Sequence, residues 1–195
     1  GRLIVAWFMT RNMERIYDAN TTIYTGMITG YNLEGGTGAA GGQSQTNITN
    51  LMLIITTDNT IHEVALRLFG RCMMYGNPNK DNNYISAQHF RELSASVPAD
   101  VKALINHNSE SATYANLKAY EKPSVDNYLF SLLNYHRWFG INNITSKLKV
   151  LQLNKSDIID IGYSSNDAGI AFNTLDILNE VFARPYQQLR FGETN

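Results

Sequence analysis

The stretch TIHEVALRLFGRCMMYG, residues 60–76, carries the clearest structural signal in the chain. Thr60 and Glu63 have the spacing of a capping box, in which the threonine hydroxyl accepts a backbone N–H and the glutamate reaches back. Apolar residues then recur at helical spacing, at Ile61, Val64, Ala65, Leu68 and Cys72. Gly76 is the expected terminator. The pattern predicts an amphipathic helix from Thr60 to Gly76 with one buried face.

The chain downstream of this helix has further start and stop signals. Ser86 is expected to open a short helix, and Ser96 and Pro98 a second one that carries Val101. Further helices are predicted over residues 111–120, 124–139 (ended by Gly140) and 167–183, with Pro185 beyond the last, and a strand over residues 149–154.

The chain upstream of residue 58 has a different composition. Between residues 19 and 57 the only charged residue is Glu34. Residues 23–28 (IYTGMI) and 51–56 (LMLIIT) have the β-branched and apolar content of strands and flank a glycine-rich loop. The sequence predicts an α+β fold in one domain, residues 1–195, with a small β-rich part (1–58, a hairpin around the loop) and a mainly α-helical part (59–195).

The glycine-rich loop, EGGTGAAGGQSQ at residues 34–45, contains the pattern G-x-G-x-x-G at Gly36, Gly38 and Gly41. A dinucleotide site needs a helix directly after the last glycine. Poor helix formers and a strand-like segment follow Gly41 instead. Asp58 stands about where a dinucleotide fold has its ribose-binding acid, but without the helix we do not expect it to have this role. We interpret the stretch as a flexible loop of weak order, and expect no cofactor.

The bulk composition sets limits on function. The chain has 195 residues, a formal net charge of −1 and 44% hydrophobic residues, which suits one soluble domain with a core. No apolar run is long enough for a membrane helix, so we expect no membrane partner. The run at residues 3–9 after Gly1 indicates a buried strand near a cut end, hence a processed or trimmed chain.

No catalytic or metal-binding constellation is predicted. The four histidines have no zinc-ligand spacing, and His136 lies on an apolar helical face, where a hydrogen-bonded core histidine is the expected interpretation. The only cysteine, Cys72, is expected to be a small buried apolar group. Asp157 and Asp160 are interpreted as solvated acids. The sequence leans against an enzyme, although residues that converge only in three dimensions stay possible.

Nucleic-acid binding is an alternative. The helix pair at residues 86–107 has the outline of a helix-turn-helix, whose second helix would offer Lys102, Asn106 and His107 without an arginine. Two basic clusters could contact phosphates without sequence specificity. The weak candidates for nucleic-acid contact are Arg2, Arg11, Arg15, Lys102, Lys147 and Lys149.

The favoured hypothesis is a non-enzymatic structural protein. A composition with 11 tyrosines and 22 asparagines suits broad polar protein–protein contacts. We therefore expect a homo-oligomer or larger assembly, such as a viral coat or nucleocapsid subunit, located in a virion or in the cytoplasm. A nucleic-acid-binding module and an enzyme with a site invisible in sequence are the alternatives.

Overall fold

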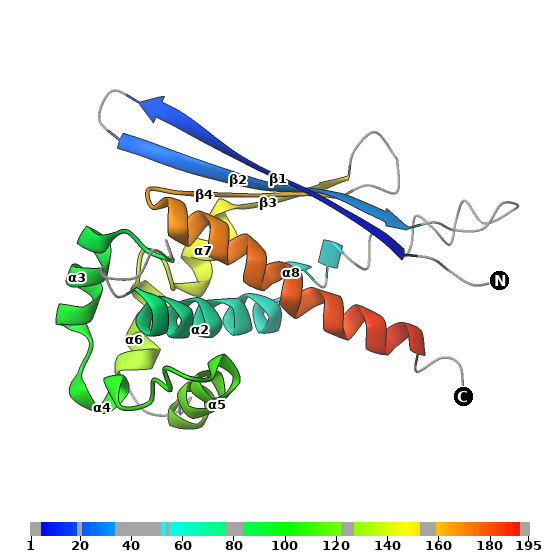
Figure 1. The fold of residues 1–195 in the computed structure, drawn as a ribbon. Coiled ribbons are helices and arrows are strands. Elements are labelled where there is room, and N and C mark those ends of the chain that lie inside the picture. The colour runs from blue at the N-terminus through cyan, green and yellow to red at the C-terminus, as the bar shows by residue number, and fades with distance from the viewer. Residues whose placement is uncertain are drawn as a thin grey trace, which may run out of the picture.

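The computed structural model describes residues 5–18, 21–33, 52–53, 55–76, 84–121, 127–152 and 159–191, with the backbone alone described for 5–33 and 182–191 (Figure 1). Its strands and helices confirm the α+β class. In chain order they are β1 (Val5–Asp18), β2 (Thr21–Leu33), α2 (Asp58–Tyr75), α3 (Ala87–Ser96), α4 (Ala99–Lys102), α5 (Glu110–Tyr120), α6 (Tyr128–Tyr135), α7 (Ile141–Lys147), β3 (Leu148–Gln152), β4 (Ile159–Ser165) and α8 (Ala168–Phe191).

The described strands form one antiparallel sheet in the order β1-β2-β4-β3. β4 lies between β2 and β3, so the helix-rich part of the chain supplies half of the sheet. The described helices lie on one side of it, with α8 against β2 and β4 and with α2 against α8 (Figure 1). The fold is thus two layers, and the face of β4 that carries Ile159, Ile161 and Tyr163 is buried.

The N-terminal hairpin differs from the predicted one. β2 includes the predicted strand at residues 23–28, but its partners are β1 and β4. The predicted strand at 51–56 is wrong, because Met52, Leu53 and Ile55 are helical. An unbroken apolar run does not distinguish a strand from a buried helical turn, and Ile55 is fully buried here. The glycine-rich loop lies outside the described residues.

Helix α2 begins one turn earlier than predicted. Its N-cap is Thr57, whose hydroxyl accepts the Thr60 N–H at 3.3 Å. Thr60 is therefore the third helical residue, and the prediction of a capping box formed by Thr60 and Glu63 is wrong. The Glu63 carboxylate instead accepts from Arg67 Nε at 2.7 Å, an i,i+4 pair.

Gly76 ends α2 as predicted, but its role is steric. Its φ of −69° is available to any residue. A Cβ there would lie 2.3 Å from Phe90 Cδ2 and 2.4 Å from the Cys72 carbonyl oxygen. Glycine is needed at this position because α3 packs closely against the end of α2.

Further along the chain, some predicted helix boundaries are confirmed and others are wrong. Ser86 caps α3 and Pro98 precedes α4, as expected, but Ser96, also expected to open the second helix, is the last residue of α3. The helix predicted to reach residue 139 ends at Tyr135, and Gly140, predicted as its terminator, is the N-cap of the unpredicted α7. The chain turns at His136, whose Nδ1 accepts the Trp138 N–H at 3.3 Å. The last helix, α8, also continues past Pro185 to Phe191.

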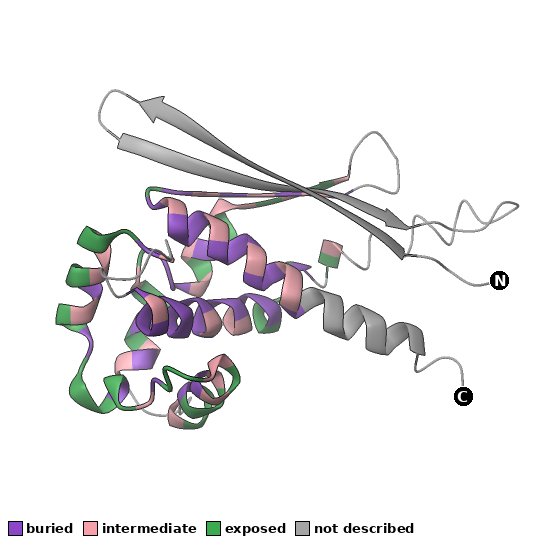
Figure 2. Ribbon diagram, in the orientation of Figure 1, coloured by how far each residue is buried: buried purple, intermediate pink, exposed green. Residues whose placement is uncertain are grey.

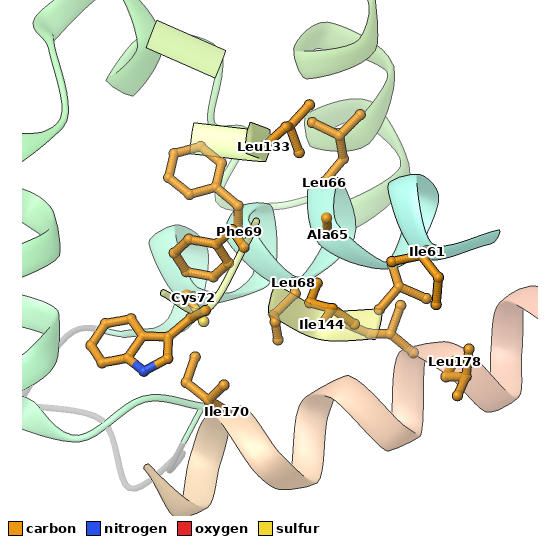
Figure 3. Close-up of a cluster of buried hydrophobic side chains, with 14 of the residues drawn as sticks. Ile61, Ala65, Leu66, Leu68, Phe69, Cys72, Leu133, Ile144, Ile170 and Leu178 are labelled. Atoms are coloured by element: carbon orange, nitrogen blue, oxygen red, sulfur yellow. The ribbon is translucent and has the colours of Figure 1, made fainter. Parts of the chain in front are cut away.

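The core lies between α2, α8 and the sheet. The predicted face of α2 is buried throughout, and residues on its other faces, such as Leu66 and Phe69, are buried as well (Figures 2 and 3). Ile170 and Leu178 of α8 point toward α2, and Ile144 of α7 lies beside them (Figure 3). Helix α2 is therefore the central element of the helical layer, because it is enclosed on nearly all sides.

Candidate functional site

A polar junction centred on the buried Asp167 joins the starts of α3 and α8. The Asp167 carboxylate caps α8 by accepting the Ile170 N–H at 3.1 Å. Its other oxygen, Oδ2, accepts the Ser86 N–H at 2.9 Å and lies 2.6 Å from His89 Nδ1. An ionised carboxylate only accepts hydrogen bonds, so Nδ1 of His89 carries the proton. The junction exists because both helices begin with a capping residue at the same place.

Burial and hydrogen bonding act on this carboxylate in opposite directions. The Asp167 side chain is only 1% exposed. Burial raises the pKa of Asp167, but hydrogen bonds from the Ser86 and Ile170 backbone and from His89 lower it more, and the net pKa is below the ordinary value. The folded protein therefore holds Asp167 as an anion.

The Trp138 ring packs beside the histidine of this junction. The centroid of the Trp138 ring lies 4.6 Å from that of His89, and the Arg137 guanidinium lies 4.1 Å from the Trp138 centroid on the way to solvent. Trp138 Nε1 donates to Asn166 Oδ1 at 2.9 Å, next to the start of α8. The carboxylate–histidine pair is the arrangement that orients a general base.

The neighbouring nucleophiles do not complete a catalytic triad. Cys72 is fully buried, as predicted, and its thiol contacts the Tyr84 carbonyl at 3.7 Å. Burial raises the pKa of Cys72, and the charge of Asp167 raises it further, so the thiol stays protonated. The Ser86 hydroxyl accepts the His89 N–H as a helix cap. The junction as described holds two helix starts together.

A second polar cluster surrounds Arg71 of α2, whose side chain is only 7% exposed. Its guanidinium donates to Asp176 at 3.0 Å and to Glu180 at 3.2 Å, both on α8. Glu110 of α5 accepts from Nη2 at 3.1 Å, and its other oxygen lies 3.0 Å from Nε as an ion pair outside hydrogen-bond geometry. One arginine therefore ties three helices together, and the fork geometry suits this task.

The surroundings of Arg71 leave little room for a ligand. A cavity of about 10 Å³ lies beside it, enough for about one water molecule. The cavity is lined by Leu66, Arg67, Gly70, Arg71, Met74, Glu110, Thr113 and Tyr114. The arrangement is that of a structural ion-pair cluster.

The four histidines have separate partners. His62 Nε2 lies 2.6 Å from Glu121, His107 Nδ1 lies 3.2 Å from the Met74 carbonyl, and His136 and His89 have the contacts described above. Within the described residues, no group of three His, Cys, Asp or Glu side chains is placed to hold a metal ion. Burial lowers the pKa of His136 to about 4, and the charge of Arg137 adds to this effect.

The candidate nucleic-acid contacts fall on different elements. Lys102 is exposed at the end of α4, a helix of only four residues, so Asn106 and His107 lie beyond it. Lys147 ends α7 and donates to the Arg137 carbonyl at 3.1 Å, and Lys149 is exposed on β3. Their role in nucleic-acid binding stays a prediction.

The remaining candidates lie in or near the sheet. Arg11 is opposite Ile28 and Arg15 opposite Tyr24 in the β1–β2 pairing, and Arg2 lies outside the described residues. Asp160 is in β4, opposite Leu151 of β3, with one buried carboxylate oxygen that has no hydrogen-bond partner. Asp160 is therefore half-buried instead of a fully solvated acid, whereas Asp157 lies outside the described residues and its interpretation as a solvated acid stays a prediction.

No protein-family model matches the chain, and no curated protein or solved structure does so either. In the part of the chain that the structure describes, no helix has the length and apolar character needed to cross a membrane.

Sequence reasoning missed both polar clusters. The signal for one was the aspartate at the start of the last helix, and for the other an arginine within the largely apolar stretch at residues 68–74.

Proposed function

We propose that this protein is a self-associating structural subunit. The observation that carries the proposal is strand β3 at the edge of the sheet. Among the described strands it pairs with β4 alone, and its outward-facing residue Leu151 is 60% exposed. Edge strands present a row of unpaired N–H and C=O groups that can pair with another chain, and a large exposed apolar side chain favours such contact.

The composition of β3 supports this proposal. Natural edge strands avoid association by being very short or by carrying charged residues such as lysine, a proline or a bulge, and β3 has neither a proline nor a bulge. β3 has Lys149 as its one charged residue, and its pairing with β4 is regular over all five residues. The described helices leave the other face of the sheet open (Figure 1). An exposed leucine on a regular edge strand favours unwanted association in a monomer, whereas in an assembly its burial stabilises the contact.

A viral coat or nucleocapsid subunit, expected from the sequence, is one form of such an assembly, and no described contact favours it over others. The alternatives have weaker support. A recognition helix needs several turns along a groove, whereas α4 has four residues. The His89–Asp167 pair has the chemistry of a general base, but its described partners are structural.

Size-exclusion chromatography with light scattering over a wide range of protein concentration tests the proposal. We expect the mass to rise with concentration, and Leu151→Lys to reduce this rise. Leu53→Lys is the matched control, because Leu53 is also 60% exposed but lies off the sheet. A chain that stays monomeric at every concentration contradicts the proposal.

A further inference from the structure

The pattern of β3 fits a second copy of itself. Resting on the proposed self-association, we infer that two copies pair antiparallel through their β3 edges about a two-fold axis, with Val150 opposite Val150 of the second copy. The two four-stranded sheets then become one sheet of eight strands. Isologous pairing of this kind is the commonest symmetry of soluble oligomers.

Symmetry limits the register of such a pair. A two-fold axis perpendicular to the sheet keeps the helix-covered face of both copies on the same side. Directly opposite residues of an antiparallel pair lie on the same face of the sheet. The two-fold axis must therefore lie midway between one residue and the same residue of the second copy. Only three such residues place most of β3 within the pairing: Lys149, Val150 and Leu151.

Charge and length select among these three registers. An axis at Lys149 puts two ammonium groups directly opposite each other, which is unfavourable. An axis at Leu151 pairs Leu148 and Lys149 with residues 154 and 153, which lie outside the described residues, so only three described residues of each strand are paired with one another. An axis at Val150 pairs Leu148 with Gln152 and Lys149 with Leu151, so all five residues of both strands are used and no like charges meet.

The two faces of the sheet are both satisfied in the Val150 register. On the helix-covered side, the partly buried Val150 meets its own copy. On the open side, Leu151 lies beside the aliphatic stem of the second copy's Lys149, whose ammonium group stays in water. The largest exposed apolar side chain of the sheet that the structure describes is thereby covered.

Cysteine cross-linking tests the register. Lys149→Cys chains and Leu151→Cys chains, given different mass tags, are mixed and mildly oxidised. We expect disulfide-linked heterodimers from the mixture and little linkage from either variant alone, because directly opposite residues have Cβ atoms within reach of a disulfide. The natural Cys72 is fully buried and does not compete.

The outcomes separate this inference from the proposed function. Linkage within Lys149→Cys alone, or no linkage in a sample that light scattering shows to be oligomeric, overturns the register and leaves self-association standing. A monomer at every concentration overturns both.

Two opposite charges at position 151 give an independent test. In the Val150 register, Leu151→Glu faces Lys149 of the second copy with attraction and Leu151→Lys faces it with repulsion. Both variants lose the leucine contact, so their comparison isolates charge. We expect tighter dimers for Leu151→Glu than for Leu151→Lys, on the order of tenfold in dissociation constant at low salt. Equal constants overturn the register.

The same two variants are expected to rank in the opposite order in the folding stability of the single subunit. A difference in dimer affinity therefore cannot result from a difference in folding stability. Within one subunit, Leu151 is opposite Asp160. Leu151→Glu therefore places like charges together and Leu151→Lys opposite charges. A variant that associates more tightly while its own fold is less stable is explained by the interface, and thermal unfolding of dilute samples provides this control.

Discussion

The Nδ1 atom of His89 lies 2.6 Å from the Oδ2 atom of Asp167, although the two residues are 78 positions apart in the chain. The contact fixes the start of α3 on the start of α8. Because Oδ2 also accepts the Ser86 N–H, a single oxygen connects the backbone and the side chain of one helix start to the cap of another. Several measurable properties follow from this contact and from the Arg71 cluster.

Asp167→Asn is expected to lower the free energy of unfolding by about 1–3 kcal/mol, because buried donors lose a charged acceptor and α8 loses part of its cap. Urea unfolding at neutral pH measures the change. Asp100→Asn is the matched control, since Asp100 lies in the first turn of α4 but is exposed. Equal effects of the two changes contradict a special role of the junction.

The lowered pKa of Asp167 predicts acid sensitivity. The folded carboxylate binds its proton less readily than the unfolded one, so its contribution is complete above the unfolded pKa, near 3.8. It is lost as the pH falls from there through the lower folded value. Asp167→Asn should therefore flatten the unfolding free energy below about pH 4. An unchanged acid limb in the variant argues against this assignment.

The depressed pKa of His136 predicts a second pH dependence. The unfolded imidazole takes up its proton near pH 6.5, whereas the folded one does so only near pH 4. The unfolded state therefore binds more protons in this window, and stability falls as the pH is lowered from about 6.5 to 4. His136→Gln should reduce this slope in urea unfolding, and the same change at the exposed His107 should leave it in place.

Removal of the Arg71 guanidinium should be costly. Arg71→Met leaves Glu110, Asp176 and Glu180 without their shared cation, and loss of one partner from a buried ion pair costs about 3–5 kcal/mol. The carboxylates are 23–39% exposed and can be hydrated, so we expect about 3 kcal/mol. Thermal or urea unfolding measures it.

Arg67 provides the control for Arg71. It lies one turn earlier on α2, its side chain is 13% exposed against 7% for Arg71, and it pairs with one carboxylate, Glu63, instead of three. Arg67→Met should cost about 1 kcal/mol or less. If Arg71→Met is no worse than this, the cluster does not hold the three helices together.

Close contact between α2 and α5 predicts coupling between Gly70 and Thr113. A Cβ at Gly70 would lie 3.0 Å from Thr113 Cγ2. Overpacking in Gly70→Ala offsets the gain of about 1 kcal/mol in helix propensity. Thr113→Ser removes Cγ2 but keeps the hydroxyl that bonds the Asn106 backbone.

A double-mutant cycle on unfolding free energies measures this coupling. In the Thr113→Ser background, Gly70→Ala is expected to be stabilising, with a coupling energy of about 1 kcal/mol relative to the single changes. Additive effects would mean that α5 moves away without cost.

Local signals predicted much of the helical layer. The apolar face of residues 61–72 is buried, Ser86 caps its helix, and the strand predicted over residues 149–154 is described as Leu148–Gln152, because capping and periodicity act over a few residues. Boundaries failed where a competing contact decided them. The helix predicted to reach residue 139 stops at Tyr135, so that Trp138 and Phe139 can enter the core.

The sequence alone determined the fold class, the central helix and the buried state of Cys72, because each depends on the pattern of neighbouring residues. Tertiary structure decided the rest. The pairing of β2 with β4 and the contacts of Asp167 with His89 and of Arg71 with Glu110 join residues that are far apart in the chain. Such contacts depend on how layers pack, and no local pattern encodes which distant partner a strand edge or a buried charge will find.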